Sequence, residues 1–120
     1  MERKRKFWGW GYEDGDPEVA HQKAIAAALA QRFAIDPLEI ASPPRIEEIS
    51  LRPSRLTVPP RLAEITSTTA EDRAAHTYGK SFRDLVRAYR REYPNPPDVV
   101  AFPRDEEEVV AVLEWADTAR

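Results

Sequence analysis

Proline placement limits what this chain can fold into more than any other feature of its sequence. Eleven of the 120 residues are proline and only four are glycine, whereas average proteins use glycine more often than proline. Six of the prolines fall between residues 36 and 70, and three more lie within residues 94–97. Because proline fixes φ and lacks an N–H donor, these stretches cannot continue a helix or form a central strand. The chain is therefore expected to contain long extended connections between short elements.

The remaining composition describes a foldable chain and removes several classes of site. Hydrophobic residues make up 42% of the sequence and charged residues 32%, which is typical of a globular protein. The absence of cysteine excludes disulfides and sulfur-ligated zinc. Two histidines cannot by themselves build a multi-histidine metal centre, so no metal site is predicted. The net charge of −3 gives no reason to expect a nucleic-acid partner. No apolar run approaches the roughly 20 residues of a membrane helix, so a cytoplasmic protein without a membrane span is expected.

The opening of the chain alternates large aromatic residues with glycine. Trp8, Trp10 and Tyr12 are separated by Gly9 and Gly11. A period of two is typical of a β-strand whose aromatic face packs on a hydrophobic surface. The alternative is a stacking platform for nucleic acid formed with the basic residues before it, but the acidic residues directly after it disfavour phosphate. The pattern thus predicts an aromatic opening strand.

Three helices are predicted from capping residues and from apolar residues at helical spacing. Asp16 is a candidate N-cap for the first helix, Ser81 with Asp84 for the second, and Asp105 with Glu108 for the third, because such residues satisfy the free N–H groups of a first turn. The predicted apolar stripes are Ile25, Leu29 and Phe33; Phe82, Leu85, Val86 and Tyr89; and Val109, Val112, Leu113 and Ala116. Helices are therefore expected over about 17–36, 81–93 and 105–120.

The rest of the chain contains a proline-rich arm and one short strand. Residues 36–70 are expected to form the arm, with short apolar islands as single helical turns lying on a larger body. Residues 98–102 are expected to form a buried strand that ends at Pro103. The only candidate partner for this strand is the opening segment. A strand followed by a helix is the front of a βαβ unit, but no second parallel strand follows. The expected fold class is α+β and truncated, with a mostly helical segment at 1–93 and the start of another domain at 94–120.

Three segments carry a family resemblance. Residues 6–12 contain a tryptophan–glycine repeat, residues 72–82 contain arginine, histidine, glycine and serine before a helix, and residues 97–109 combine an apolar strand with an acidic helix start. In this order they resemble segments of the alkyldihydroxyacetonephosphate synthase-like, FAD-linked oxidoreductases of the vanillyl-alcohol-oxidase superfamily. The resemblance implies the N-terminal part of an FAD-dependent oxidoreductase, ending in the first β–α of a PCMH-type FAD-binding domain.

The same resemblance implies a cofactor and partners. FAD would be bound by the parent protein, whereas this chain stops before the glycine-rich loop that would cradle the FAD pyrophosphate. Pro103 is the one cofactor-side residue that the resemblance assigns, and no catalytic residue is assigned. The implied partners are the remainder of the FAD and cap domains and a small-molecule substrate, and a homodimer is left open. Whether the chain is itself an enzyme is also left open, and alone it is expected to be inactive.

A function of a different class remains as an alternative, together with two candidate features. The alternative is a stand-alone α+β interaction module with a basic helix face and no catalysis. His76 follows Asp72 at helical spacing, but no serine, threonine or cysteine completes a triad, so it is interpreted as a loop histidine bonded to backbone. The seven basic residues from Arg73 to Arg104 are interpreted as a solvated helix face, and the alternative is a patch for a phosphate or acidic partner.

Overall fold

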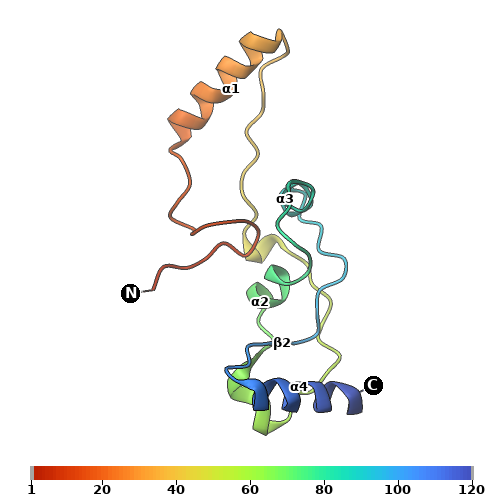
Figure 1. Cartoon of the computed structure of the whole chain (residues 1–120). Helices are drawn as coiled ribbons and strands as arrows, with labels where there is room; N and C mark the ends of the chain where they lie inside the picture. Colours follow the sequence, from red (N-terminus) through yellow and green to blue (C-terminus); the bar gives the residue numbers. More distant parts are fainter. Residues whose placement is uncertain (1, 120) are drawn as a thin grey trace.

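The molecule is elongated, with a helix at each end. The structure is a computed structural model that describes residues 2–119, so Met1 and the predicted helix end at Arg120 lie outside it. In chain order the elements are α1 (Val19–Phe33), the 3-10 helices η1 (Ile46–Glu48) and η2 (Pro60–Ile65), β1 (Thr66–Ser67), α2 (Ala70–Ala75), α3 (Phe82–Tyr89), β2 (Val100–Ala101) and α4 (Glu106–Thr118). The molecule measures 58 × 32 × 23 Å, and α1 and α4 lie at opposite ends of it (Figure 1). Its radius of gyration is 18.7 Å, whereas a compact chain of this length has about 14 Å.

The later helices begin where their capping residues predict. At α3, the Ser81 hydroxyl accepts a hydrogen bond from the Asp84 N–H at 3.3 Å, and Asp84 accepts one from the Ser81 N–H at 3.1 Å. At α4, Asp105 accepts a hydrogen bond from the Glu108 N–H at 2.9 Å. The Glu108 carboxylate, however, accepts from the N–H of Arg104 instead of that of Asp105. The first capping box is therefore complete and the second is half formed.

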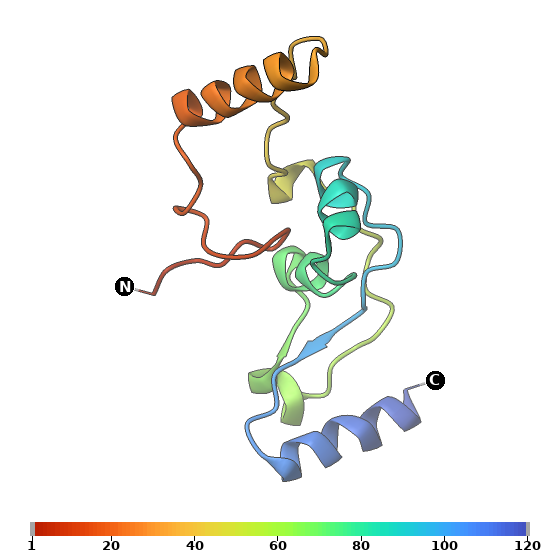
Figure 2. The ribbon, with the colours of Figure 1, turned by 45° about the horizontal axis from the view of Figure 1, so that its top comes forward.

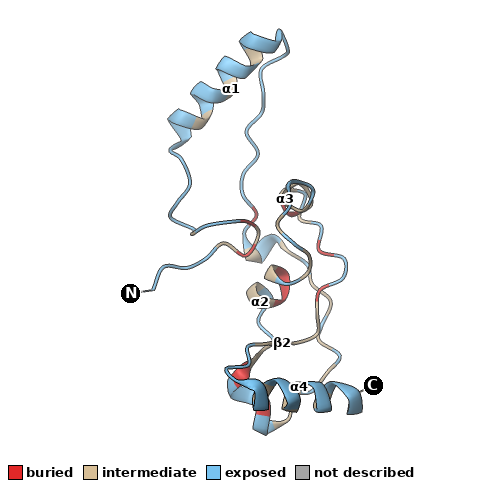
Figure 3. Ribbon diagram, in the orientation of Figure 1, coloured by how far each residue is buried: buried red, intermediate tan, exposed pale blue. Residues whose placement is uncertain are grey.

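The first helix forms, but Asp16 does not cap it. α1 follows Glu18, whose side chain makes no capping hydrogen bond, while Asp16 forms an ion pair with Lys6. None of the α1 residues is buried, and Figure 3 shows most of the helix exposed. The predicted apolar stripe of α1 is therefore open to solvent. No helix within residues 2–119 is long and apolar enough to cross a membrane.

The opening segment is a tight turn, so the predicted aromatic strand is wrong. The Lys6 N–H donates to the Gly11 carbonyl at 3.1 Å, and Arg5 and Tyr12 form a single antiparallel bridge. Gly11 has a φ of +84°, a conformation that glycine adopts without steric cost. This reverses the chain after only a few residues. We call residues 4–13 the opening turn.

The sheet is a short antiparallel pair formed by the arm and the predicted strand. β1 pairs with β2 so that Thr66 lies opposite Ala101, and the Phe102 N–H extends the pairing by donating to the Ile65 carbonyl at 2.7 Å. Of the strand expected at 98–102 only Val100–Ala101 forms, and its partner comes from the end of the arm rather than from the opening segment. Figure 2 shows β2 running beside the chain that leaves η2.

The core is small and draws on segments that are far apart in the sequence. Phe7, Ala74, Ala88 and Tyr93 are buried together. The partly buried residues packed around them are Trp8, Ile46, Ile49, Leu51, Ala75 and Tyr78. The opening turn and the arm therefore supply part of the core, although the arm was expected to lie on a larger body. The domain boundary expected after residue 93 stays a prediction, because the arm contacts residues both before and after it.

Candidate functional site

A charged cluster fastens the arm to the start of β2. Asp98 accepts hydrogen bonds from the Arg55 Nη2 at 2.8 Å, the Arg55 backbone N–H at 2.9 Å and the Arg52 Nη1 at 2.5 Å. The hydrogen bonds from Arg55, and next those from Arg52, hold the pKa of the Asp98 carboxyl well below its usual range. We call these three residues the Asp98 clamp. Because the carboxylate stays ionised at neutral pH, the clamp holds the entrance of β2 against the arm.

Arg73 completes this attachment from α2. It is 6% exposed and is the one charged residue that is buried in the described part of the chain. Its Nε donates to the Pro97 carbonyl at 2.8 Å and its Nη2 to the Arg52 carbonyl at 2.7 Å. The guanidinium therefore joins α2, the arm and the residues before β2. The sequence predicts Arg73 in a solvated basic face, because residue spacing carries no signal for a buried arginine that binds carbonyl groups.

The other basic residues do not form one continuous cationic surface. Arg91 binds Glu48 at 2.9 Å, Arg104 binds Glu108 at 2.5 Å, and Arg87 binds Asp84 at 3.4 Å. The hydrogen bonds from the N–H and side chain of Arg104 lower the pKa of Glu108. Arg91 and Arg104 of the predicted basic face are therefore each paired with a carboxylate of this chain.

His76 lies in a groove of about 660 Å³ beside the opening turn. We call this cavity the opening groove, and its walls include Arg5, Trp10, His76, Tyr78, Lys80 and Phe102. The His76 Nδ1 is 2.7 Å from the Asp72 carbonyl oxygen, and the ring meets Phe102 edge-on with 5.9 Å between centroids. The interpretation of His76 as a loop histidine bonded to backbone is thus confirmed, with the carbonyl rather than the carboxylate of Asp72 as its partner.

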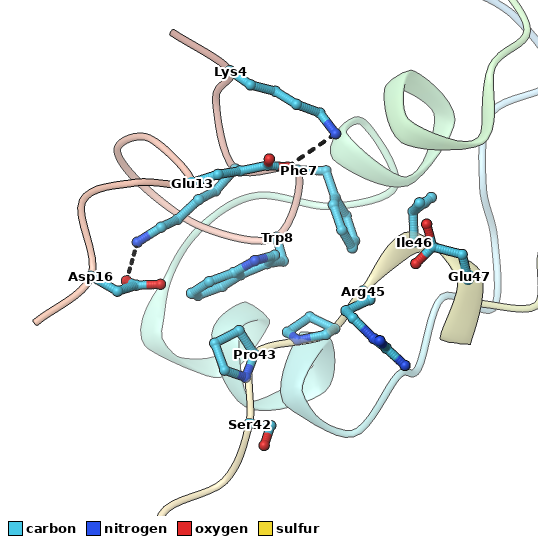
Figure 4. A pocket seen from close by; sticks show the side chains of 12 residues that line it. Lys4, Phe7, Trp8, Glu13, Asp16, Ser42, Pro43, Arg45, Ile46 and Glu47 are labelled. Atoms are coloured by element: carbon cyan, nitrogen blue, oxygen red, sulfur yellow. Dashed lines mark hydrogen bonds and ion pairs between the residues drawn. The ribbon is translucent and has the colours of Figure 1, made fainter. Parts of the chain in front are cut away.

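A second hollow of about 540 Å³ lies on the other side of the opening turn, against the arm. Figure 4 shows Trp8 between the ion-paired side chains and the prolines of the arm. Lys4 binds Glu13 at 3.1 Å and Lys6 binds Asp16, so the cations at this hollow already have carboxylate partners. Trp8 packs edge-on against Tyr89 at 5.3 Å. The hollow is therefore a junction between packed segments.

Pro103, the residue that the resemblance assigns to the cofactor side, lies in the connection from β2 to α4. Pro103 is exposed in that connection, and its cofactor role stays a prediction. The α4 N-terminus is capped by Asp105 and carries three glutamates in its first turn, so its charge opposes a pyrophosphate. The four glycines, Gly9, Gly11, Gly15 and Gly79, are not grouped as a phosphate loop requires. The described residues around Pro103 therefore do not fit an FAD pyrophosphate.

Comparison with known proteins gives one sequence match and two structural matches. The chain is 41% identical over 44 residues to the alkyldihydroxyacetonephosphate synthase of Dictyostelium discoideum, which covers 37% of this chain and 7% of that protein. Its fold matches two crystal structures of alkyldihydroxyacetonephosphate synthase, in space groups P1 and P212121, with TM-scores of 0.68 and 0.63 at 21% and 22% identity. No protein-family model matches the chain.

The structural matches extend over almost the whole of this chain. Each structural match covers 95% of this chain, but the chain spans only 26% and 25% of the two solved proteins. The same extended arrangement therefore occurs as a minor portion of a much larger molecule. This chain is partially similar to alkyldihydroxyacetonephosphate synthase, and it has the fold of about a quarter of that protein.

Proposed function

We propose that this chain is the N-terminal part of an FAD-dependent enzyme of the alkyldihydroxyacetonephosphate synthase type. The observation that supports this most strongly is the structural match over 95% of an elongated chain, together with local identity to the same protein. Pro103 would then lie on the cofactor side, with the FAD and a small-molecule substrate held by the remainder of the parent protein.

The chain's own contribution would be to position the entry of the flavin domain. The Asp98 clamp and Arg73 hold the residues before β2 against the arm and α2, and Asp105 fixes the start of α4. The outer face of α4 exposes Val109, Val110 and Leu113, an apolar surface on which further secondary structure could pack. Substrate chemistry would be performed by residues outside this chain.

The proposal is tested by expressing the coding sequence together with any reading frame that follows residue 120. We expect the longer product to copurify with flavin and to show its visible absorbance, because the glycine-rich loop would then be present. The 120-residue chain mixed with FAD should show no saturable quenching of flavin fluorescence.

A matched pair of variants in the longer product separates positioning from simple charge loss. Arg73→Gln removes the buried guanidinium that supports β2, so it should lower the flavin content, while Arg83→Gln on the exposed face of α3 should leave it unchanged. A stop codon directly after residue 120, with a stably folded product, would instead support the stand-alone interaction module.

A further inference from the structure

The opening groove combines fixed aromatic surface with cations that have no carboxylate partner. Its walls come from the opening turn, from the connection between α2 and α3, and from the exit of β2. Its volume of about 660 Å³ falls in the range of small-molecule sites. The residues of the Asp98 clamp and Arg73 do not line this cavity.

Trp10 is held in place without being buried. Its indole Nε1–H donates to the Lys80 carbonyl at 3.0 Å, yet the residue is 74% exposed. The hydrogen bond limits the rotation of the side chain while its ring remains accessible. An exposed aromatic ring that is already ordered loses little entropy when a ligand packs on it. Phe102, also on the groove, is 47% exposed, which provides a second aromatic contact.

The charges around the groove leave two cations available. Lys4 binds Glu13 and Glu71 and Lys6 binds Asp16, so these ammonium groups are already neutralised. Arg5 and Lys80 form no ion pair within residues 2–119, and Arg5 lies 5.5 Å from the Tyr12 ring. Two carboxylates line the groove: that of Glu71 faces Lys4 at 3.8 Å, and that of Asp72 accepts a hydrogen bond from the Thr69 hydroxyl at 3.0 Å.

His76 adds a third polar group. Its Nδ1 contacts a carbonyl oxygen, which can only accept, so the proton of the neutral ring resides on Nδ1. The Nε2 has no hydrogen-bond partner in the part of the chain that the structure describes. It is therefore open to accept a hydrogen bond from a ligand hydroxyl.

We propose that the opening groove binds a small organic anion with an aromatic group. The anionic head, a phosphate or carboxylate, binds Arg5 and Lys80, because guanidinium and ammonium groups form charge-assisted hydrogen bonds with such oxygens. The aromatic part packs on Trp10 and Phe102. This site uses only residues of this chain, so it does not depend on the proposed flavoprotein function.

The test follows the indole N–H resonance of Trp10 during titration of the full chain with phenyl phosphate. A saturable shift of this resonance is expected, and a Trp10→Phe variant assigns it among the three tryptophans of the chain. Benzoate distinguishes a carboxylate head from a phosphate head. Benzyl alcohol tests whether charge is needed, and inorganic phosphate tests whether the aromatic part is needed. Both of the last two are expected to bind more weakly.

The decisive variant is the double substitution Arg5→Gln and Lys80→Gln. It removes both free cations and keeps the Lys80 carbonyl that holds Trp10, and it should weaken binding by about tenfold or more. The matched control is Lys23→Gln with Arg32→Gln on α1, which changes net charge equally and should leave the affinity unchanged. An unchanged Trp8 indole resonance verifies that the variants are folded.

Three results would overturn the proposal. They are the absence of a saturable shift with either aromatic anion, equal affinity in the double variant, and equal affinity for inorganic phosphate. None of these results bears on flavin content of a longer product, so the two proposals fail separately.

Discussion

Tyr93 is a buried polar residue whose hydroxyl has no partner with full hydrogen-bond geometry in residues 2–119, although it interacts with the hydroxyl of Tyr78. It is 5% exposed and stacks on Tyr78 with 5.1 Å between ring centroids. Burial raises the pKa of the Tyr93 hydroxyl above its ordinary value, so the group stays neutral. An unsatisfied buried hydroxyl lowers stability, because it has lost its hydrogen bonds to water.

Replacing Tyr93 with phenylalanine should therefore stabilise the fold, by about 1 kcal/mol in the free energy of unfolding. The neighbouring Tyr78→Phe is the matched control, since the Tyr78 hydroxyl donates to the Glu92 carbonyl at 2.9 Å. That control should destabilise the fold by about 1 kcal/mol. Urea unfolding of the two variants checks both signs, and destabilisation by Tyr93→Phe would mean that the hydroxyl has a partner.

Single residues were predictable only where their partners are close in sequence. Ser81 and Asp105 were identified as caps because each acts on a residue three positions further along. Asp98 and Arg52 are 46 residues apart, and no local pattern indicates that they meet. Arg73 was misread for the same reason, since its acceptors lie on two distant segments.

Helix α1 ends at a residue poorly suited to its conformation. The C-cap Ala34 has a φ of +48°, in the left-handed region, and its N–H bonds to the helix. A Cβ is disfavoured there, and glycine is the usual occupant of such a position. Because no α1 residue is buried, the helix depends on its own hydrogen bonds and caps.

Ala34→Gly should therefore stabilise α1 by about 1 kcal/mol and slow the exchange of its amide hydrogens. The matched control is Ala28→Gly in the exposed middle of the same helix, which should speed exchange by a similar free energy. Hydrogen-exchange mass spectrometry of the α1 peptides measures both. Faster exchange in Ala34→Gly would contradict the strain argument.

At the scale of elements, the helices α1, α3 and α4 were predictable, whereas α2 and the pairing of the strands were not. The stripes over 81–93 and 105–120 repeat at helical spacing, and α3 and α4 form there. The opening turn imitates a strand because its aromatic residues alternate with glycine, but Gly11 reverses the chain. β1 and β2 contain two residues each, which is too short for alternation to indicate a partner. The opening groove could not be predicted either, because it is formed by the opening turn together with Phe102, which is distant in the sequence.

The Asp98 clamp attaches the residues before β2 to the arm. Because hydrogen bonds from Arg55 and Arg52 lower the pKa of Asp98 in the folded state, its contribution is present above the ordinary aspartate pKa of about 3.9. It is lost only as the pH falls through the lower folded-state pKa. Stability from the clamp is therefore complete at neutral pH.

Asp98→Asn should lower the Tm at neutral pH, and the difference from the unmodified chain should vanish in strong acid. Asp14→Asn is the control, because Asp14 and its partner Arg3 are both more than half exposed and such pairs contribute little. Thermal unfolding followed by circular dichroism over a pH series measures the effect. Equal Tm losses in the two variants would contradict a special role for the clamp.

The 58 Å long axis also governs how the molecule moves through solvent. An extended particle experiences more friction than a sphere of equal mass, so it diffuses slowly and enters fewer pores of a chromatographic gel. With a radius of gyration of 18.7 Å against about 14 Å for a compact chain, this 13.7 kDa protein should elute ahead of globular standards of its own mass. Its elution volume therefore reports its length, and counting its subunits requires light scattering.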